Sequence, residues 1–171
     1  MSDPDCLLLA PDAQWPNSAL PALAYRAVLP DSRQTAGEFE TLFNRNGWPA
    51  AWRDTLYGYD HYHANAHECL GIARGHARIQ LGGDNGKAVE VRAGDALVLP
   101  AGVAHRLLEG SDDLQVVGAY PPGQSADRLL GKPGERPAAD RKIAALPTPA
   151  TDPVQGAQGP LTRLWHQAAT T

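Results

Sequence analysis

The chain has 171 residues, and its 15 Lys and Arg against 19 Asp and Glu give a formal net charge of −4. This length fits one domain with a substantial core, and the acidic balance without a Lys/Arg cluster argues against nucleic acid as a partner. Two cysteines argue against a disulfide framework, and no apolar stretch approaches the roughly twenty residues that cross a bilayer.

Residues 1–56 form an N-terminal extension in which we expect one helix. Thr35 and Glu38 have the spacing of a capping box, in which each residue satisfies a free backbone N–H of the first turn. Apolar residues follow at helical spacing, and Gly47 is a suitable stop. These apolar residues, which we expect to pack against the core, are Phe39, Leu42 and Phe43.

The first ten residues of this extension indicate where in the cell we expect the protein. Residues 1–5 are acidic, and the apolar run over residues 7–10 is too short for the core of a signal peptide. We therefore expect a cytoplasmic protein with no membrane partner.

Residues 57–120 have the pattern of closely spaced short strands. Ala77, Ile79 and Leu81 alternate with polar neighbours, which indicates a strand buried on one face. Residues 82–86 are dense in Gly, Asp and Asn and predict a tight turn before the next alternating stretch. Many short strands with regular turns are typical of an antiparallel sandwich or barrel, so we expect an all-β fold.

Residues 121–171 hold eight of the fifteen prolines and show little periodicity. We expect an irregular, Pro-rich tail that wraps the same domain and is not a second one. Its predicted anchors on the core are Leu161, Leu164 and Trp165.

Two histidine-containing segments fit a single metal site. His61 and His63 are two residues apart, so both side chains point to the same face of a strand. Glu68 follows shortly downstream, and His105 comes from another predicted strand. Three imidazoles and a carboxylate suit one divalent transition metal, Fe, Mn, Ni, Zn or Cu, better than Ca or Mg. The competing interpretation is that these histidines bind no metal and are satisfied by hydrogen bonds.

This arrangement resembles the two sequence motifs of the cupins. The first motif has two histidines separated by a single residue, then a glutamate and a glycine, matched here by His61, His63, Glu68 and Gly75. The second motif is matched at the same fixed spacing by Gly94, Pro100, Gly102 and His105. Two positions differ, because Thr55 stands in place of the opening glycine and Glu109 in place of the closing asparagine. Neither position is a usual ligand.

More narrowly, the chain resembles the small bacterial YjlB-like cupins. The further matching stretches are residues 46–48, 52–53, 117–121, 131–136, 152–154 and 159–161. The resemblance implies a single jelly-roll barrel with an N-terminal helix, and it implies a homodimer. It also implies that His61, His63, Glu68 and His105 bind the metal, with Glu68 as the residue that matters most for catalysis.

His67 complicates this assignment because it is the neighbour of Glu68. Neighbours on a regular strand point to opposite faces, so only one of the two reaches the metal unless a bulge intervenes. The motif spacing favours Glu68, which leaves His67 at the surface or behind the ligands. By the same alternation, Tyr62 should face away from the metal and Cys69 should be inert packing opposite Glu68.

The sequence leaves three functions open. The first is a small metal-dependent enzyme, of oxygenase or isomerase type, acting on a small organic molecule. The second is a module that binds a small molecule or a metal without turnover. The third is a jelly roll whose metal only stabilises the fold. Fold and ligand set do not separate these functions.

Overall fold

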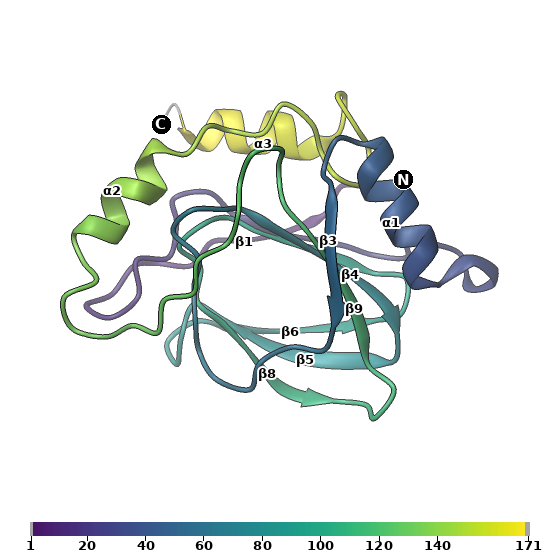
Figure 1. Cartoon of the computed structure of the whole chain (residues 1–171), viewed down its shortest axis with the longest axis horizontal. Coiled ribbons are helices and arrows are strands. Elements are labelled where there is room, and N and C mark those ends of the chain that lie inside the picture. Colours follow the sequence, from purple (N-terminus) through teal and green to yellow (C-terminus); the bar gives the residue numbers. More distant parts are fainter. Residues whose placement is uncertain (1, 170–171) are drawn as a thin grey trace.

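The computed structural model describes residues 2–169, which form two antiparallel sheets with helices at their periphery (Figure 1). The larger sheet has the strand order β1 (Asp5–Leu7), β2 (Ala22–Tyr25), β7 (Ala96–Leu99), β4 (Glu68–Arg74), β9 (Gln115–Ala119) and β3 (Ala50–Asp54). The smaller sheet has the order β6 (Lys87–Arg92), β5 (His76–Leu81) and β8 (His105–Gly110). The helices are α1 (Ala36–Arg45), α2 (Ala138–Ala145) and α3 (Pro160–Ala169), with a short 3-10 turn at Asp31–Arg33.

The main core lies between the two sheets. Strand β5 turns Ala77, Ile79 and Leu81 inward, as the alternation predicts, and β6 adds Val89 and Val91. The larger sheet supplies the opposite wall, with Leu70, Ile72, Leu97, Leu99 and Val116. The β-rich fold is thereby confirmed, whereas closure into a barrel stays a prediction.

A second core joins α1 to the outer face of the larger sheet. The Thr35 hydroxyl accepts the Glu38 N–H at 3.2 Å, so the predicted capping residue starts the helix, and Gly47 follows its end with φ of +84°. Phe39 is fully buried against Gly71 of β4, where an added Cβ would lie 2.6 Å from the ring. The absence of a side chain at this position lets the helix approach the sheet closely.

The N-terminal extension contributes three strands as well as the predicted helix. Strands β1, β2 and β3 lie within residues 1–56; β1 and β3 form the two edges of the larger sheet, and β2 pairs with β1. They were missed because each has three to five residues, too few for a period to emerge. In addition, all four residues of β2 are buried, which removes the alternation altogether.

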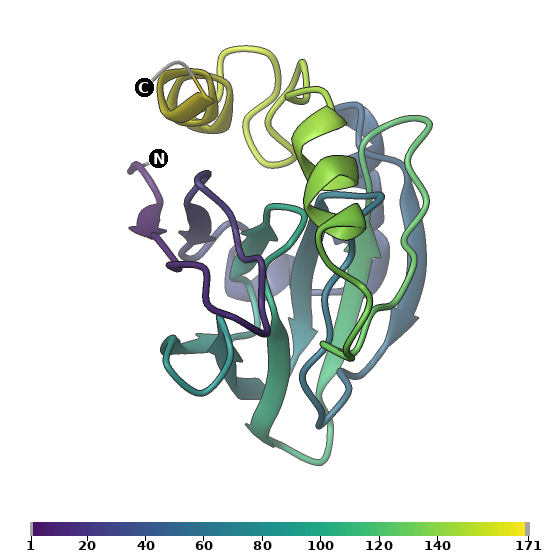
Figure 2. The same ribbon diagram turned by 90° about the vertical axis from the view of Figure 1, so that its left-hand side faces the viewer.

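The C-terminal region differs from the predicted irregular tail because it contains α2 and α3. Prolines mark the start of both helices, since Pro137 precedes α2 and Pro160 is the first residue of α3. Leu161 and Trp165 are fully buried and Leu164 partly so, which confirms the predicted anchors. Figure 2 shows α3 end-on above the N-terminal strands, where Arg163 pairs with Asp3 at 3.3 Å.

None of the helices within residues 2–169 has the length and apolar composition needed to cross a membrane.

Asp152 joins the C-terminal region to the larger sheet. Its fully buried carboxylate accepts the Tyr25 hydroxyl of β2 at 2.6 Å and the Leu161 N–H of α3 at 3.0 Å. It also accepts the N–H groups of Val154 and Gln155 at 2.7 and 3.0 Å. A buried carboxylate is tolerated when several donors satisfy it. This residue therefore fixes where α3 begins and which face of the sheet it covers.

Replacing Asp152 by alanine should lower the free energy of unfolding by about 3 kcal/mol, because three buried donors and one partly buried donor lose their acceptor. Urea unfolding followed by tryptophan fluorescence measures this change. Asp112→Ala, at an exposed position, is the matched control and should leave the midpoint unchanged. Equal midpoints for the two variants would contradict the assigned role of Asp152.

Candidate metal centre

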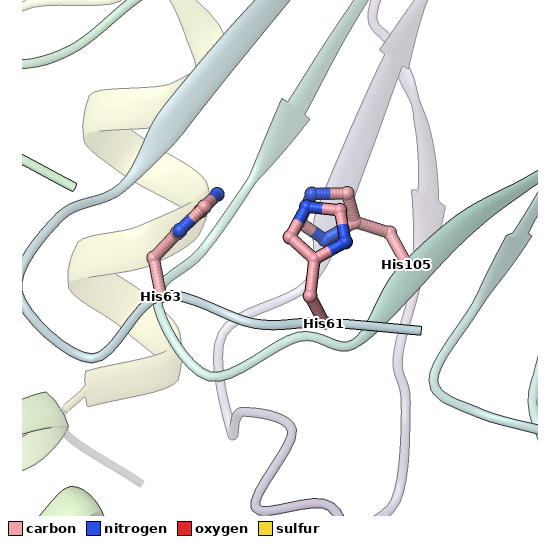
Figure 3. Close-up of side chains that lie close together, drawn as sticks. All are labelled: His61, His63 and His105. Carbon is pink, nitrogen blue, oxygen red and sulfur yellow. The ribbon is translucent and has the colours of Figure 1, made fainter. Parts of the chain in front are cut away.

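Three histidine side chains meet in the interior at one end of the two sheets. His61 and His63 come from the segment that precedes β4, and His105 is the first residue of β8 (Figure 3). One ligand nitrogen from each lies within 4.8 Å of the other two. The three residues are 5, 9 and 4% exposed. The structure thus brings together the three histidines that the sequence singled out.

Backbone pairing places these side chains. His61 and His105 exchange two backbone hydrogen bonds of 3.3 and 2.9 Å, and Tyr62 exchanges two of 2.9 Å with Leu129. The segment therefore forms isolated bridges and no continuous strand, but it is extended enough for side chains to alternate. Tyr62 points away from the histidines, as predicted, and its buried ring packs edge-on against Trp15 at a centroid distance of 6.1 Å.

The same backbone fixes the orientation of each imidazole. Every Nδ1 atom of the three histidines lies at hydrogen-bonding distance from a main-chain carbonyl oxygen. The carbonyls belong to Tyr59 for His61, Asp127 for His63 and Val103 for His105. A carbonyl only accepts, so each Nδ1 carries a proton, and each Nε2 presents a lone pair when its imidazole is neutral. This is the tautomer that a metal-binding histidine needs.

Glu68, the first residue of β4, lies against two of these rings. Its Oε1 atom is 3.4 Å from Nε2 of His63 and 3.5 Å from Nε2 of His105. The side chain is buried, and Cys69 points to the opposite side of β4 into the helix-facing core. The predicted alternation between Glu68 and Cys69 is therefore confirmed, and the carboxylate stands beside the histidines.

Burial and neighbouring charges shift the pKa values of this group. Burial lowers the pKa of His61 to about 3, and His105 adds to the effect. Burial also opposes the charged form of His63, but the Glu68 carboxylate outweighs it and raises the pKa of His63. Burial alone would raise the pKa of Glu68, yet His105 and His63 together hold it below its usual range. Glu68 is thus an ionised carboxylate and His61 a neutral imidazole near neutral pH.

These residues fit a divalent transition metal. Nε2 of His63 is buried without a hydrogen-bond partner in residues 2–169, although buried polar atoms are normally paired. A cation bound between the rings would satisfy this lone pair together with those of His61 and His105. Nitrogen donors with one nearby carboxylate match Zn, Fe, Mn, Ni or Cu, whereas Ca and Mg prefer oxygen alone.

His67 lies elsewhere and is buried, so its placement at the surface was wrong. Its Nδ1 accepts the Ala101 N–H at 2.9 Å, and its ring lies 4.9 Å from that of Trp165 in α3. Burial lowers the pKa of His67 to about 4, which keeps the imidazole neutral. The residue therefore links the loop before β8 to α3. This helix covers the side of the larger sheet away from the histidines.

A cavity of about 530 Å³ opens onto the three histidines and Glu68. Tyr120 lines it, and its hydroxyl accepts the Trp52 N–H at 2.9 Å. The indole of Trp52 lies over Gly118, where an added Cβ would be 2.0 Å from the ring. Burial, then the charge of Glu68, raises the pKa of Tyr120 well above its usual range, so the phenol keeps its proton.

Sequence reasoning missed Tyr120 because it follows β9, far along the chain from both histidine segments. Tyr57 also lines the cavity, and the ring of Tyr59 stacks on that of Tyr57 at a centroid distance of 4.9 Å. A larger cavity of about 680 Å³ lies along His76, Arg78 and Glu90, away from the histidine group.

The fold and site define a double-sheet β protein with a buried three-histidine group. Residues 54–120 match the family described as Cupin domain. The "Uncharacterized protein YjlB" of Bacillus subtilis (strain 168) is 41% identical over 155 residues, which span 90% of this chain and 92% of that protein. The chain therefore belongs to the cupins and is a relative of YjlB.

Several solved structures share part of the fold. Acireductone dioxygenase from Bacillus anthracis, with a cadmium ion in its active centre, is 19% identical, with 64% of this chain and 78% of that chain covered and a TM-score of 0.39. Vicilin from Solanum lycopersicum (tomato) is 15% identical, with 77% and 36% covered and a TM-score of 0.40.

Replacing His67 by alanine should reduce stability but leave metal uptake intact, because its contacts lead to Ala101 and Trp165. We expect a loss of about 2 kcal/mol in the free energy of unfolding, from one buried hydrogen bond and the cavity created. Chemical unfolding and zinc titration of the same sample measure both quantities. Loss of zinc binding in a folded His67→Ala variant would contradict the assignment of His67 to stability and not to metal binding.

Proposed function

We propose that this chain is a small metal-dependent enzyme, of oxygenase or isomerase type, that acts on a small organic molecule. His61, His63, Glu68 and His105 would hold one divalent Fe, Mn, Ni, Zn or Cu ion. The observation that carries this proposal is the common orientation of the three imidazoles. Main-chain carbonyls fix all three Nδ1 protons, so three lone pairs are available at the inner end of a cavity.

The charges of this set favour an oxygen-bearing ligand. Three neutral imidazoles and one carboxylate would leave one of the two positive charges of a divalent ion uncompensated. That excess charge attracts a carbonyl, enolate or carboxylate oxygen, and the bound ion would supply Lewis-acid or oxygen-activating chemistry. Glu68, which contacts His63 and His105, would reduce the charge and orient the rings.

Tyr120 is the protein group placed to handle a proton. Its phenol lines the cavity and keeps its proton, because burial and the charge of Glu68 both oppose ionisation. The Trp52 N–H occupies one lone pair of the phenol oxygen, which directs the hydroxyl proton elsewhere. We assign Tyr120 as a proton donor to substrate bound in the cavity.

The experiments below also distinguish this enzyme from the two other functions, a binding module and a structural metal site. A module that binds a small molecule without turnover would take up metal and ligand but form no product. A structural metal would raise thermal stability and exchange no ligand. A homodimer and a cytoplasmic location also stay predictions, and light scattering of the purified protein tests the first.

Protein purified without chelators or added metal should contain close to one equivalent of a divalent transition metal. Elemental analysis measures this content. Glu68→Ala should reduce it, and His61→Ala/His63→Ala should abolish it, because two of three imidazole ligands are lost. His76→Ala removes an exposed histidine and serves as the control. Stoichiometric metal in the double variant, or no metal bound by the wild type on titration, would overturn the site.

Turnover should depend on Tyr120 separately from metal binding. With a panel of small keto and hydroxy acids, oxygen uptake and isomerisation assays should detect product formed by the metal-loaded protein. Tyr120→Phe should keep its metal and lower kcat about a hundredfold, because the general acid is lost. Ligand binding without product across the panel would favour the binding module, and an unchanged kcat in Tyr120→Phe would remove Tyr120 from the mechanism.

A further inference from the structure

The mouth of the histidine cavity carries an arginine on an aromatic platform. The guanidinium carbon of Arg128 lies 5.3 Å from the ring centre of Tyr57 and 6.0 Å from that of Tyr59. The two rings stack on each other, and Tyr57 also meets the ring of His61 edge-on at 5.3 Å. The platform is therefore continuous with the metal-binding group. Tyr57 and Tyr59 are 50 and 42% exposed, so neighbouring side chains do not cover it.

Arg128 is held through the face of its guanidinium and not through its N–H groups. Within residues 2–169 it takes part in no hydrogen bond or ion pair, whereas Arg53 is paired with Glu40 at 2.6 Å and Arg136 with Asp140 at 2.9 Å. Contact with a ring face leaves the five N–H donors of the guanidinium free at its edge. Such a group is oriented in advance for a planar oxyanion, which accepts two parallel hydrogen bonds.

The charge distribution in the cavity makes this arginine unusual. Among the described residues that line the cavity, Arg128 is the one Lys or Arg side chain. Within residues 2–169, none of the three acidic groups that line the cavity forms an ion pair with Arg128, and Asp54 accepts the Thr55 N–H at 2.8 Å. Asp127 accepts the backbone N–H groups of Ala64 and Asn65 at 2.8 and 3.1 Å, and Glu68 faces the histidines. The guanidinium thus lacks a protein counterion at the open end of the cavity.

We propose that Arg128, seated on Tyr57 and Tyr59, forms a carboxylate-binding subsite. The substrate class is then a small organic acid that places an oxygen donor at the histidine group and a second, distal carboxylate on Arg128. This inference rests on the proposed metal-dependent function. A carboxylate fits better than a phosphate because one guanidinium balances its single charge, whereas a phosphate dianion would also face Asp127 and Asp54. The volume of about 530 Å³ suits such a molecule.

Cobalt-loaded protein gives a direct test, because its visible absorption changes when a ligand binds the metal. The probes are two pairs of α-keto acids of matched chain length, one member with a distal carboxylate and one without. The pairs are α-ketoglutarate with α-ketovalerate and α-ketoadipate with α-ketocaproate. In at least one pair the wild type should bind the diacid about tenfold more tightly or better, as expected for a bidentate arginine contact.

Arg128→Gln should remove this preference by weakening the diacid alone, with the affinity for the monoacid unchanged. Arg128→Lys, which keeps the charge but not the paired donors, should give an intermediate preference. Arg78→Gln, at an exposed position on β5, is the matched control. The cobalt content and monoacid affinity of each variant report that it is folded and that its metal site is intact.

The outcomes separate the subsite from the metal site. Cobalt binding with equal affinity for diacid and monoacid in both pairs would overturn the subsite alone. A preference that persists in Arg128→Gln would overturn the assignment to Arg128. Failure of the wild type to bind cobalt would overturn the metal site and this inference with it.

Discussion

The pairing of His61 with His105 is the contact on which the site depends. Two backbone hydrogen bonds join the segment before β4 to the start of β8, and they bring two imidazoles to a centroid distance of 4.2 Å. His63 follows on the same face, and the Gly102 N–H holds its carbonyl at 2.8 Å. Main-chain groups hold both the backbone and the Nδ1 atoms of the three histidines. That leaves the Nε2 atoms for chemistry.

The histidine set was predictable because it needs only local geometry and fixed turns. An extended backbone at residues 61–63 makes alternate side chains share a face, even though no continuous strand forms there. Gly94 and Gly102 have φ of +98° and +97°, a conformation that favours glycine, so their positions mark the turns that flank β7. Tyr120 and Arg128 lie beyond β9, and only the tertiary fold brings them to the cavity. No spacing in the sequence marks them.

Secondary-structure elements were predictable from the sequence where the apolar pattern repeats over enough residues to be recognised. The helix at α1 and the alternating strand β5 follow from capping and from period two. Strands β1 to β3 escaped because they are short, and α2 and α3 because their proline-rich surroundings masked them. Asp152 shows most clearly that contacts between distant parts of the chain cannot be predicted from local sequence. Its role depends on Tyr25, which lies on β2 near the other end of the chain, so its sequence neighbours could not reveal it.

The pKa shifts of His61 and His63 indicate how a metal ion and a proton would compete for the site. Burial keeps His61 neutral, whereas the charge of Glu68 favours a proton on His63. A divalent ion would need the same Nε2 lone pair of His63, and it would compensate the same carboxylate. Metal uptake would therefore release the proton from His63 while His61 needs no change in protonation. The Glu68 carboxylate would thus serve both forms of the site, because it favours a proton on His63 in one form and would compensate the charge of a bound metal in the other.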